Sequence, residues 1–495
     1  MNIGLMVLSG LLVSLSFPSW LANGLRPWTG WLAWIALVPA LVVLERLPPR
    51  RAAVAGWVGG LACWLSTIYW VAAIHELTYF RVPAWFLMSA VLAGYWALWG
   101  WLVARAGPGR ALWAAPAAWG VAEWIRGWLF TGFPWIPLGA SQWAAPAVFL
   151  SARFIGVLGL SVAVVIVNVA VRAAFGPWAR RRVEMAVGAA AVAVLVVLSA
   201  VAGRHVTADF AGARTVRMAL LQGGFTEEEK NVLPADIMVA RYEMLARKAA
   251  PARPAVMVWP ETAVACPIQA PGLLPRAQKL AERTGAGQLM GALYEGPTGK
   301  VYNGVFLVSR WSIEGHYYKT HLVAFGEYIP AWFRAVSPVA RKLISSIMDL
   351  SPGTDHTPIP LPGGGTAGAE VCYEAVFAEH GRQTAKWGAE VLVNVTNDAW
   401  YWRTAATWQH ALGPISRAVE CGRDLVRCAN TGATLTASPR GAVVCEIPLF
   451  VPGVQVADVH LIRGRTFWVR MGDLPLVFVL AAVLLAAAWR RDRKA

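Results

Sequence analysis

The sequence predicts a multi-pass α-helical membrane domain of eight helices, joined to an extracytoplasmic α/β domain. Of the 495 residues, 57% are hydrophobic and only 15% are charged, whereas about 25% of a soluble globular chain is charged. Mean hydropathy is +0.49, and the 27 tryptophans suit a protein that meets membrane–water interfaces. Long apolar stretches fill residues 1–204, and short β-rich runs fill residues 205–470.

Eight stretches are apolar over about the 20 residues that a membrane-spanning helix needs. They lie at 3–22, 28–45, 52–73, 84–104, 111–129, 148–171, 184–202 and 474–489. The first lacks the basic start and the cleavage site of a secretory signal, so we expect it to remain as a helix. The fifth contains Glu123 and Arg126 on one helical face. Charges inside a membrane are candidates for a functional site, and a buried structural ion pair explains these two equally well.

Basic residues fall in alternate connections, and this sets the predicted orientation. Arginine and lysine gather around residues 46–51, 105–110, 172–182 and 490–494, whereas the 74–83 and 130–147 connections contain only Arg81. We therefore expect both termini in the cytoplasm and residues 205–470 on the outer face of an inner membrane. The net charge of +16 then reflects topology signals and anionic lipid contacts rather than a nucleic-acid partner.

The hydrophilic block at residues 205–470 has the pattern of an α/β domain. Its β-rich runs lie at 216–222, 255–260, 288–294, 303–309, 369–373, 390–396, 424–430 and 443–449, with helix-like stretches such as 237–250 between them. This alternation is typical of α/β proteins, and about 250 residues suffice for one core. We therefore expect three parts: residues 1–204 with seven helices, residues 205–470, and residues 471–495 with the last helix and a basic tail.

Three of the short runs end in chemically capable side chains. VMVWPE ends in Glu261, HYYKTH carries Lys319 and AEVCYE carries Cys372. Functional groups gather at the carboxyl ends of strands in open α/β sheets, so these three could converge on one pocket. Taken singly, Cys372 could be a structural or disulfide-bonded thiol, and the other two could be solvated surface charges.

The spacing of these residues resembles the Glu–Lys–Cys set of the nitrilase superfamily: W-P-E, a lysine 58 residues on, and C-Y-E 53 residues further. Seven helices before that domain and one after it resemble the apolipoprotein N-acyltransferase family. The supporting stretches are EWIRGWLFTGFPW (123–135), KTHLVAFGEYIP (319–330), NVTNDAW (394–400) and ANTGAT (429–434). The resemblance covers essentially the whole chain. One departure is LLQGGFTEEEKNV (220–232), where Gly224 replaces the usual Asn and the usual Lys-Trp pair has no Trp.

The resemblance implies a nitrilase-like αββα sandwich in residues 205–470, and a ping-pong N-acyltransferase in a bacterial inner membrane. A cysteine is only a few per cent thiolate at neutral pH, so Cys372 as nucleophile needs Glu261 as general base. Lys319 would stabilise the oxyanion. Three more residues would shape the pocket, and for the two glutamates a salt-bridge network is the alternative: Glu327, Tyr373 and Glu374.

The implied acyl donor is a membrane phospholipid, and the implied acceptor is the α-amine of a diacylated apolipoprotein. We expect a monomer with a periplasmic catalytic domain, no cofactor and no metal. The compartment permits disulfides, and the sequence does not choose among pairings of Cys266, Cys421, Cys428 and Cys445. Two other functions compete: a membrane-anchored amidohydrolase that uses water as acceptor, and an inactive transporter or scaffold.

Two segments are candidates for a lipid entrance. The stretch 331–350 mixes Trp332 and Phe333 with basic residues, which suits an interfacial arm and equally an ordinary helix of its own domain. The aromatic loop 130–139 carries Phe133 and Trp135 and lies on the same predicted side of the membrane.

Overall fold

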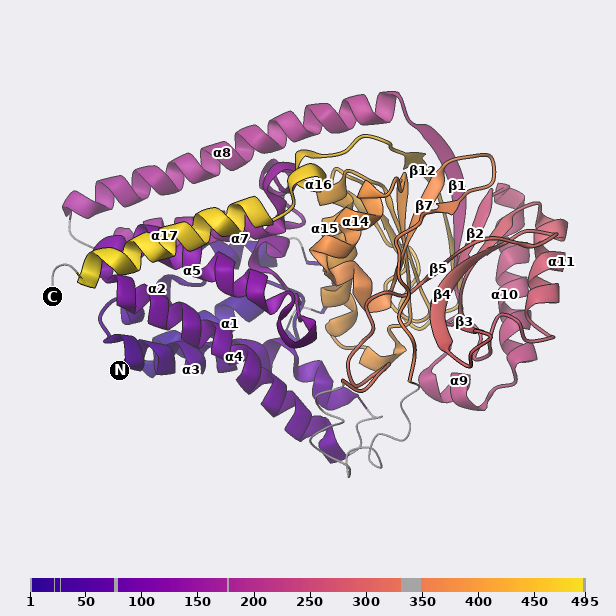
Figure 1. Cartoon of the computed structure of the whole chain (residues 1–495), viewed down its shortest axis with the longest axis horizontal. Coiled ribbons are helices and arrows are strands. Elements are labelled where there is room, and N and C mark those ends of the chain that lie inside the picture. Colours follow the sequence, from indigo (N-terminus) through magenta and orange to yellow (C-terminus); the bar gives the residue numbers. More distant parts are fainter. Residues whose placement is uncertain are drawn as a thin grey trace. The chain divides into compact units, whose positions relative to one another are not determined.

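The computed structural model describes residues 2–21, 23–26, 28–74, 79–175, 178–330 and 349–492. The chain divides into two compact units (Figure 1). A helical unit contains Met1–Ala208, Tyr401–Glu420 and Thr466–Ala495, and an α/β unit contains Asp209–Trp400 and Cys421–Arg465. The segment Tyr401–Glu420 thus belongs with the helices, although we expected it inside the 205–470 domain.

The helical unit is built from α1 (Ile3–Leu15), α2 (Val38–Leu44), α3 (Pro49–Thr67), α4 (Arg81–Ala106), α5 (Ala111–Arg126), α6 (Pro146–Phe149), α7 (Ala152–Ala173), α8 (Trp178–Ala211), α15 (Ala406–Cys421), α16 (Phe467–Met471) and α17 (Leu474–Asp492). Three of the described helices are long and apolar enough to cross a membrane: Arg81–Ala106, Ala152–Ala173 and Arg181–Ala211. Shorter apolar helices lie at Ile3–Leu15, Thr29–Leu44 and Leu474–Ala487.

Two expected spans are shorter than the hydropathy pattern suggests. The first ends at Leu15, three residues before Pro18, because proline disfavours helix in the residue before it. The stretch 28–45 is a 3-10 helix, Thr29–Trp34, followed by α2 with Pro39 in its first turn. A proline at that place starts a helix but cannot continue one from the preceding turn.

Small residues let the helices of this unit approach closely. A Cβ on Gly10 of α1 would lie 2.1 Å from the carbonyl oxygen of Gly59 in α3, and one on Gly56 would lie 2.3 Å from that of Trp96 in α4. Close backbone approach at small residues is the usual packing mode between membrane helices.

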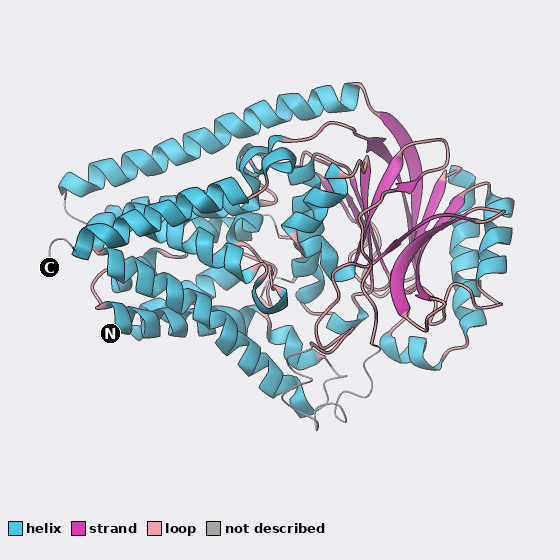
Figure 2. Cartoon of the chain, viewed as in Figure 1, coloured by secondary structure: helices cyan, strands magenta, loops and turns pink. Residues whose placement is uncertain are grey.

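The α/β unit contains two six-stranded sheets (Figure 2). The first has the order β12-β1-β2-β3-β4-β5 and the second β11-β10-β9-β8-β7-β6. The first consists of β1 (Arg214–Gln222), β2 (Val256–Trp259), β3 (Gly287–Glu295), β4 (Val301–Val308), β5 (Ile313–Tyr318) and β12 (Gly453–Leu461). The second consists of β6 (Ile359–Pro360), β7 (Thr366–Val371), β8 (Val391–Thr396), β9 (Leu425–Ala429), β10 (Leu435–Ala437) and β11 (Val443–Val444). The central pairs β1–β2, β2–β3, β7–β8 and β8–β9 are parallel.

Alternate residues of β2 show how the layers form. Val256 and Val258 belong to a core shared with the second sheet, whereas Met257 and Trp259 join a core with α10 (Ala235–Ala249) and α11 (Leu274–Thr284). Successive side chains of a strand point to opposite faces, so both faces of this sheet are covered. The short α9 (Glu227–Val232) follows β1, and α14 (Ala378–Lys386) packs on β7.

Candidate active site

The three candidate catalytic residues each follow a strand. Glu261 comes two residues after β2, Lys319 directly after β5, and Cys372 directly after β7. The structure brings them together: Lys319 Nζ lies 3.6 Å from Glu261 Oε1, and both charges act on the Cys372 thiol. One cluster therefore draws on both sheets.

Lys319 is held by carboxylates on two sides. Its side chain is 1% exposed, and Nζ lies 2.8 Å from Glu327 Oε1. Asn303 of β4 donates from Nδ2 to Glu261 Oε1 at 2.8 Å and to Glu327 Oε1 at 3.2 Å. Burial alone would lower the pKa of Lys319, but Glu327, Glu261 and Cys372 outweigh it, and the net pKa is raised. The group is an ammonium ion at physiological pH.

Cys372 occupies a strained turn. Its φ is +53°, in the left-handed region that non-glycine residues rarely adopt, and it opens the 3-10 helix Cys372–Val376. Burial raises the pKa of the thiol, and Glu261 raises it further, while Lys319 opposes them. The resting group is therefore a thiol, which needs a base before it can attack.

Side chains of the second sheet hold this turn in place. Asn394 of β8 donates from Nδ2 to the carbonyl oxygen of Cys372 at 3.3 Å. Arg427 of β9 donates to Asn394 Oδ1 and, at 2.7 Å, to Asp398 Oδ2. The Arg427 and Asp398 side chains are both 0% exposed. Loss of one partner from such a buried pair typically costs about 3–5 kcal/mol, so substitution of either residue alone would disturb the support of the turn.

Glu374 ties the Cys372 turn to the Lys319 segment. Its Oε1 accepts hydrogen bonds from Tyr317 Oη and from the backbone nitrogens of Thr320 and His321 at 2.7–3.0 Å, and its Oε2 accepts from Val371 N at 2.7 Å. Burial would raise the pKa of Glu374, but His380, Lys319 and the backbone donors lower it overall. Glu374 is 0% exposed. This burial favours a structural role in a buried polar network over a role as a residue that lines the substrate pocket.

The other predicted site residues are Tyr373 and the four candidates for a lipid entrance. The Tyr373 ring packs against Phe377 at 5.1 Å between centroids, next to the thiol in sequence. Trp135 is 1% exposed and lies in the core of the helical unit, stacked on Phe133 at 5.7 Å. Trp332 and Phe333 lie outside the described residues. A lipid entrance therefore remains a prediction.

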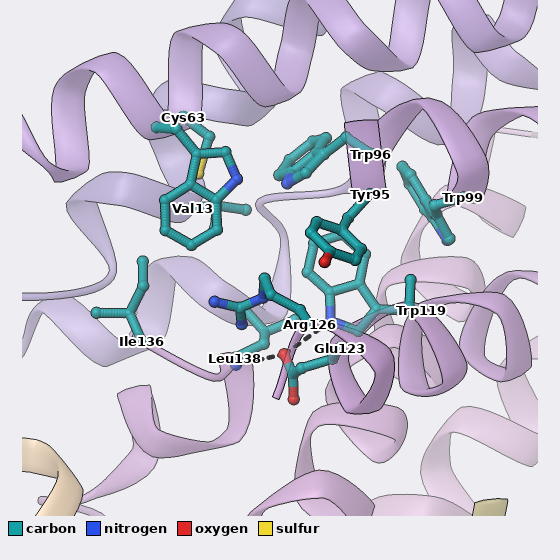
Figure 3. Close-up of a pocket in the computed structure, with 12 residues that line it drawn as sticks. Val13, Cys63, Tyr95, Trp96, Trp99, Trp119, Glu123, Arg126, Ile136 and Leu138 are labelled. Carbon is teal, nitrogen blue, oxygen red and sulfur yellow. Dashed lines mark hydrogen bonds between the residues drawn. The ribbon is translucent and has the colours of Figure 1, made fainter. Parts of the chain in front are cut away.

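Glu123 and Arg126 anchor the loop after α5 (Figure 3). Glu123 accepts hydrogen bonds from Leu138 N at 2.9 Å and Trp119 Nε1 at 3.2 Å. It also accepts one from Ser161 Oγ at 2.6 Å. Arg126 donates to the carbonyl oxygens of Phe133 and Trp135 at 3.0 and 2.6 Å. These bonds pair buried and half-buried polar groups of the loop, which would be costly to leave without partners. The cavity beside them, about 40 Å³, has room for a few waters.

Several supporting residues escaped sequence reasoning. The central ones are polar side chains on buried strand positions or just after a strand: Asn303, Asn394, Asn397 and Arg427. A buried asparagine inside a β-rich run was the available signal, because buried polar groups need partners. Among the residues that the structure describes, no disulfide joins the cysteines, and Cys428 donates to the carbonyl oxygens of Leu221 and Val258.

Comparison with known proteins agrees with this architecture. Residues 9–170 match the family model "Apolipoprotein N-acyltransferase N-terminal domain" and residues 217–466 match "Carbon-nitrogen hydrolase". An apolipoprotein N-acyltransferase of Geobacter metallireducens is 36% identical, with 98% of this chain and 95% of the relative covered. Its counterpart in Ralstonia nicotianae is 34% identical, with 94% and 90% covered.

Solved structures resemble part of the chain. An amidase of the nitrilase superfamily from Nesterenkonia, in mutant form, is 20% identical with a TM-score of 0.40, covering 53% of this chain and 95% of that one. A nitrilase-superfamily protein of Saccharomyces cerevisiae is 18% identical with a TM-score of 0.39, covering 50% and 90%. The carbon–nitrogen hydrolase match shows a nitrilase-like fold in residues 217–466. With a close relative covered over nearly its full length, the chain belongs to the apolipoprotein N-acyltransferase family.

Proposed function

We propose that this protein transfers an acyl chain from a membrane phospholipid to the α-amino group of the diacylglyceryl-modified N-terminal cysteine of apolipoproteins. Family membership over the whole chain supports this activity. The observation that carries the mechanism is the clustering of Glu261, Lys319 and Cys372 in one buried site.

The first half-reaction acylates Cys372. Glu261 takes the thiol proton as sulfur attacks the ester carbonyl carbon. Lys319 and the backbone N–H of Tyr373 stabilise the oxyanion, and losing one such donor typically costs about 3–4 kcal/mol. As the intermediate collapses, the C–O bond breaks and Glu261 returns the proton to the leaving lysophospholipid.

The second half-reaction forms an amide. The acceptor amine attacks the thioester, Glu261 takes a proton from the amine nitrogen, and the C–S bond breaks. The proton passes to the sulfur and regenerates the thiol. A thioester is activated toward an amine, and water must be kept from it. Glu327 and Glu374 position the catalytic groups through Lys319 and the Cys372 turn.

The helices suit a reaction in which both substrates are held in a bilayer. We propose eight crossings, both termini in the cytoplasm, and residues 205–470 as a periplasmic catalytic domain in which the site opens toward the membrane. Phe133, Trp332 and Phe333 are candidates for the lipid entrance. A membrane-anchored amidohydrolase would use the same three residues, but an anchor needs one helix only.

Labelled phospholipid tests the proposal. Purified protein is incubated with phospholipid that carries a radiolabelled acyl chain, and label on the protein is measured with and without hydroxylamine, which cleaves thioesters. We expect a hydroxylamine-sensitive adduct that Cys372→Ala abolishes and that Cys445→Ala, at an exposed thiol, retains. Free fatty acid and lysophospholipid without any protein adduct would instead indicate a hydrolase.

A further inference from the structure

A basic cavity lies in the helical unit, where the start of α3 meets the end of α4. It measures about 640 Å³ and opens at the surface, and ligand pockets typically measure roughly 300–1,000 Å³. The residues that line it come from these two ends: Pro48, Pro49, Arg50, Arg51, Trp101 and Arg105. The proposed acyl transfer uses none of them.

Close packing of α3 against α4 fixes the place of this cavity. A Cβ on Gly100 of α4 would lie 2.6 Å from the carbonyl oxygen of Ala52 in α3. The contact of Gly56 with Trp96, described above, lies farther along α3 and earlier in α4. The two helices therefore run side by side in opposite directions (Figure 1), and the first turn of α3 lies beside the last turn of α4.

Three guanidinium groups line the cavity. Arg50 and Arg51 belong to the first turn of α3, and Arg105 belongs to the last turn of α4. No carboxylate is among the described residues that line it. Glu45, the acidic residue nearest in sequence to this turn of α3, pairs with Arg172 instead. The cavity therefore carries a concentrated positive charge.

The backbone at the start of α3 adds to this charge. Its first turn has no side-chain cap among the described residues, and the N–H groups at a helix start carry partial positive charge. Two arginines at this place are unfavourable for the helix itself. A topology signal explains basic residues in this connection but not why they gather with Arg105 around one cavity. Binding of an anion explains both observations.

The position of the cavity along α4 favours a phospholipid as the source of that anion. Helix α4, Arg81–Ala106, is long and apolar enough to cross a membrane, and the end of a crossing helix lies at the level of the lipid head groups. Trp101 is 39% exposed, and tryptophan is enriched at that level. Arginine binds phosphate through two parallel hydrogen bonds, and basic pockets between membrane helices bind acidic head groups.

We propose that this cavity binds the head group of an anionic phospholipid. Arg50, Arg51 and Arg105 contact the phosphate, and Trp101 packs against the glycerol and the first carbons of the acyl chains. The catalytic residues belong to the α/β unit, so this is a second lipid site, and it does not depend on the proposed acyl transfer.

Native mass spectrometry of the full chain in detergent tests the proposal. Phosphatidylglycerol is titrated into the wild type and into a variant that combines Arg50→Gln, Arg51→Gln and Arg105→Gln. We expect the variant to hold one tightly bound phosphatidylglycerol fewer, with affinity at this site lowered by at least about tenfold, because each basic residue near an anionic lipid surface contributes about fivefold. Phosphatidylethanolamine, which has no net charge, should bind both proteins alike.

Arg46→Gln is the matched control, since Arg46 is an exposed arginine of the same connection that does not line the cavity. It should keep the full number of bound lipids. An equal loss in Arg46→Gln would show a diffuse basic surface and would overturn the proposal. If the triple variant is not recovered folded, Arg105→Gln alone should weaken binding about fivefold, and unchanged binding in that variant also overturns the proposal.

Inorganic phosphate separates a lipid from a free anion. At millimolar concentration it should leave phosphatidylglycerol in place, and displacement of the lipid would make the cavity a site for free anions instead. Acylation of Cys372 should be the same in the triple variant and the wild type. Failure of the wild type to form an acyl-enzyme would refute the proposed function only, because the number of bound lipids still decides whether the cavity binds one.

Discussion

Single residues set the reactivity of the Cys372 thiol through charge. Glu261 raises its pKa and Lys319 lowers it, on top of a larger rise from burial. A neutral thiol is a weak nucleophile, so Cys372 stays unreactive until a substrate carbonyl arrives and its proton moves to a base. This arrangement keeps Cys372 unreactive in the absence of substrate. Two substitutions that shift the pKa of the thiol in opposite directions test it.

We expect Glu261→Gln to lower the pKa of Cys372, because a negative neighbour is removed, and Lys319→Met to raise it, because a positive one is removed. The measurement is the rate of site-resolved alkylation between pH 6 and pH 10. The curve should shift to lower pH in the first variant and to higher pH in the second. Glu314→Gln, at an exposed carboxylate of β5, is the control, and shifts of the same sign in both variants would contradict this account.

Among single residues, the sequence predicted the chemically active side chains but few of the polar side chains that hold them in place. Glu261, Lys319 and Cys372 stand out because each follows a β-rich run. Asn303 and Arg427 do not, because their function depends on partners brought close by strand pairing, such as Asn394 opposite Arg427 in the β8–β9 register.

Among the secondary-structure elements, α15 is the one that the sequence assigned to the wrong unit. Its composition is that of an ordinary helix in the hydrophilic block, yet it packs with the helical unit. Gln409 accounts for this. Its Oε1 accepts from Trp70 Nε1 at 3.1 Å and Trp135 Nε1 at 2.8 Å, and its Nε2 donates to the carbonyl oxygens of Pro18 and Thr67 at 2.7 and 3.1 Å.

Gln409→Leu should loosen α15. The substitution leaves two buried indole N–H groups and two carbonyl oxygens without this partner, and each unsatisfied buried group costs about 1–3 kcal/mol. We expect a lower unfolding temperature in detergent and faster amide hydrogen exchange across residues 406–421. Gln278→Leu, at a solvent-exposed hydrogen bond of α11, should change neither quantity. Unchanged exchange in α15 would show that Gln409 does not anchor the helix.

For the whole molecule, the hydropathy pattern predicted eight membrane-spanning helices, and fewer of the described helices are long enough to span. Three described helices meet the length and hydropathy needed to cross a membrane, whereas α1 has 13 residues and α5 has 16. Prolines and polar loops shorten several helices, and hydropathy averages over those breaks. The α/β pattern was more informative, because alternation along a strand reports directly which face is buried.

The helix α17 decides the orientation of the chain in the membrane. Its apolar part, Leu474–Ala487, extends about 21 Å at 1.5 Å per residue. With its charged end the 19-residue helix extends about 28 Å, against about 30 Å for the hydrocarbon core. If α17 crosses the membrane, reporters on its two sides lie in different compartments. Alkaline phosphatase, active only outside the cytoplasm, should work when fused after Arg465 and fail when fused after Ala495. Green fluorescent protein should show the opposite pattern.

A third fusion, after Gly109 in the arginine-containing turn between α4 and α5, should behave like the one after Ala495, because basic connections remain inside. Replacing Arg490 and Arg491 with glutamine in the Ala495 fusion tests whether the tail charge contributes to that placement. Equal phosphatase activity on both sides of α17 would mean that it does not span. The catalytic domain would then need another route to the outer face, and the eight-helix arrangement would have to be abandoned.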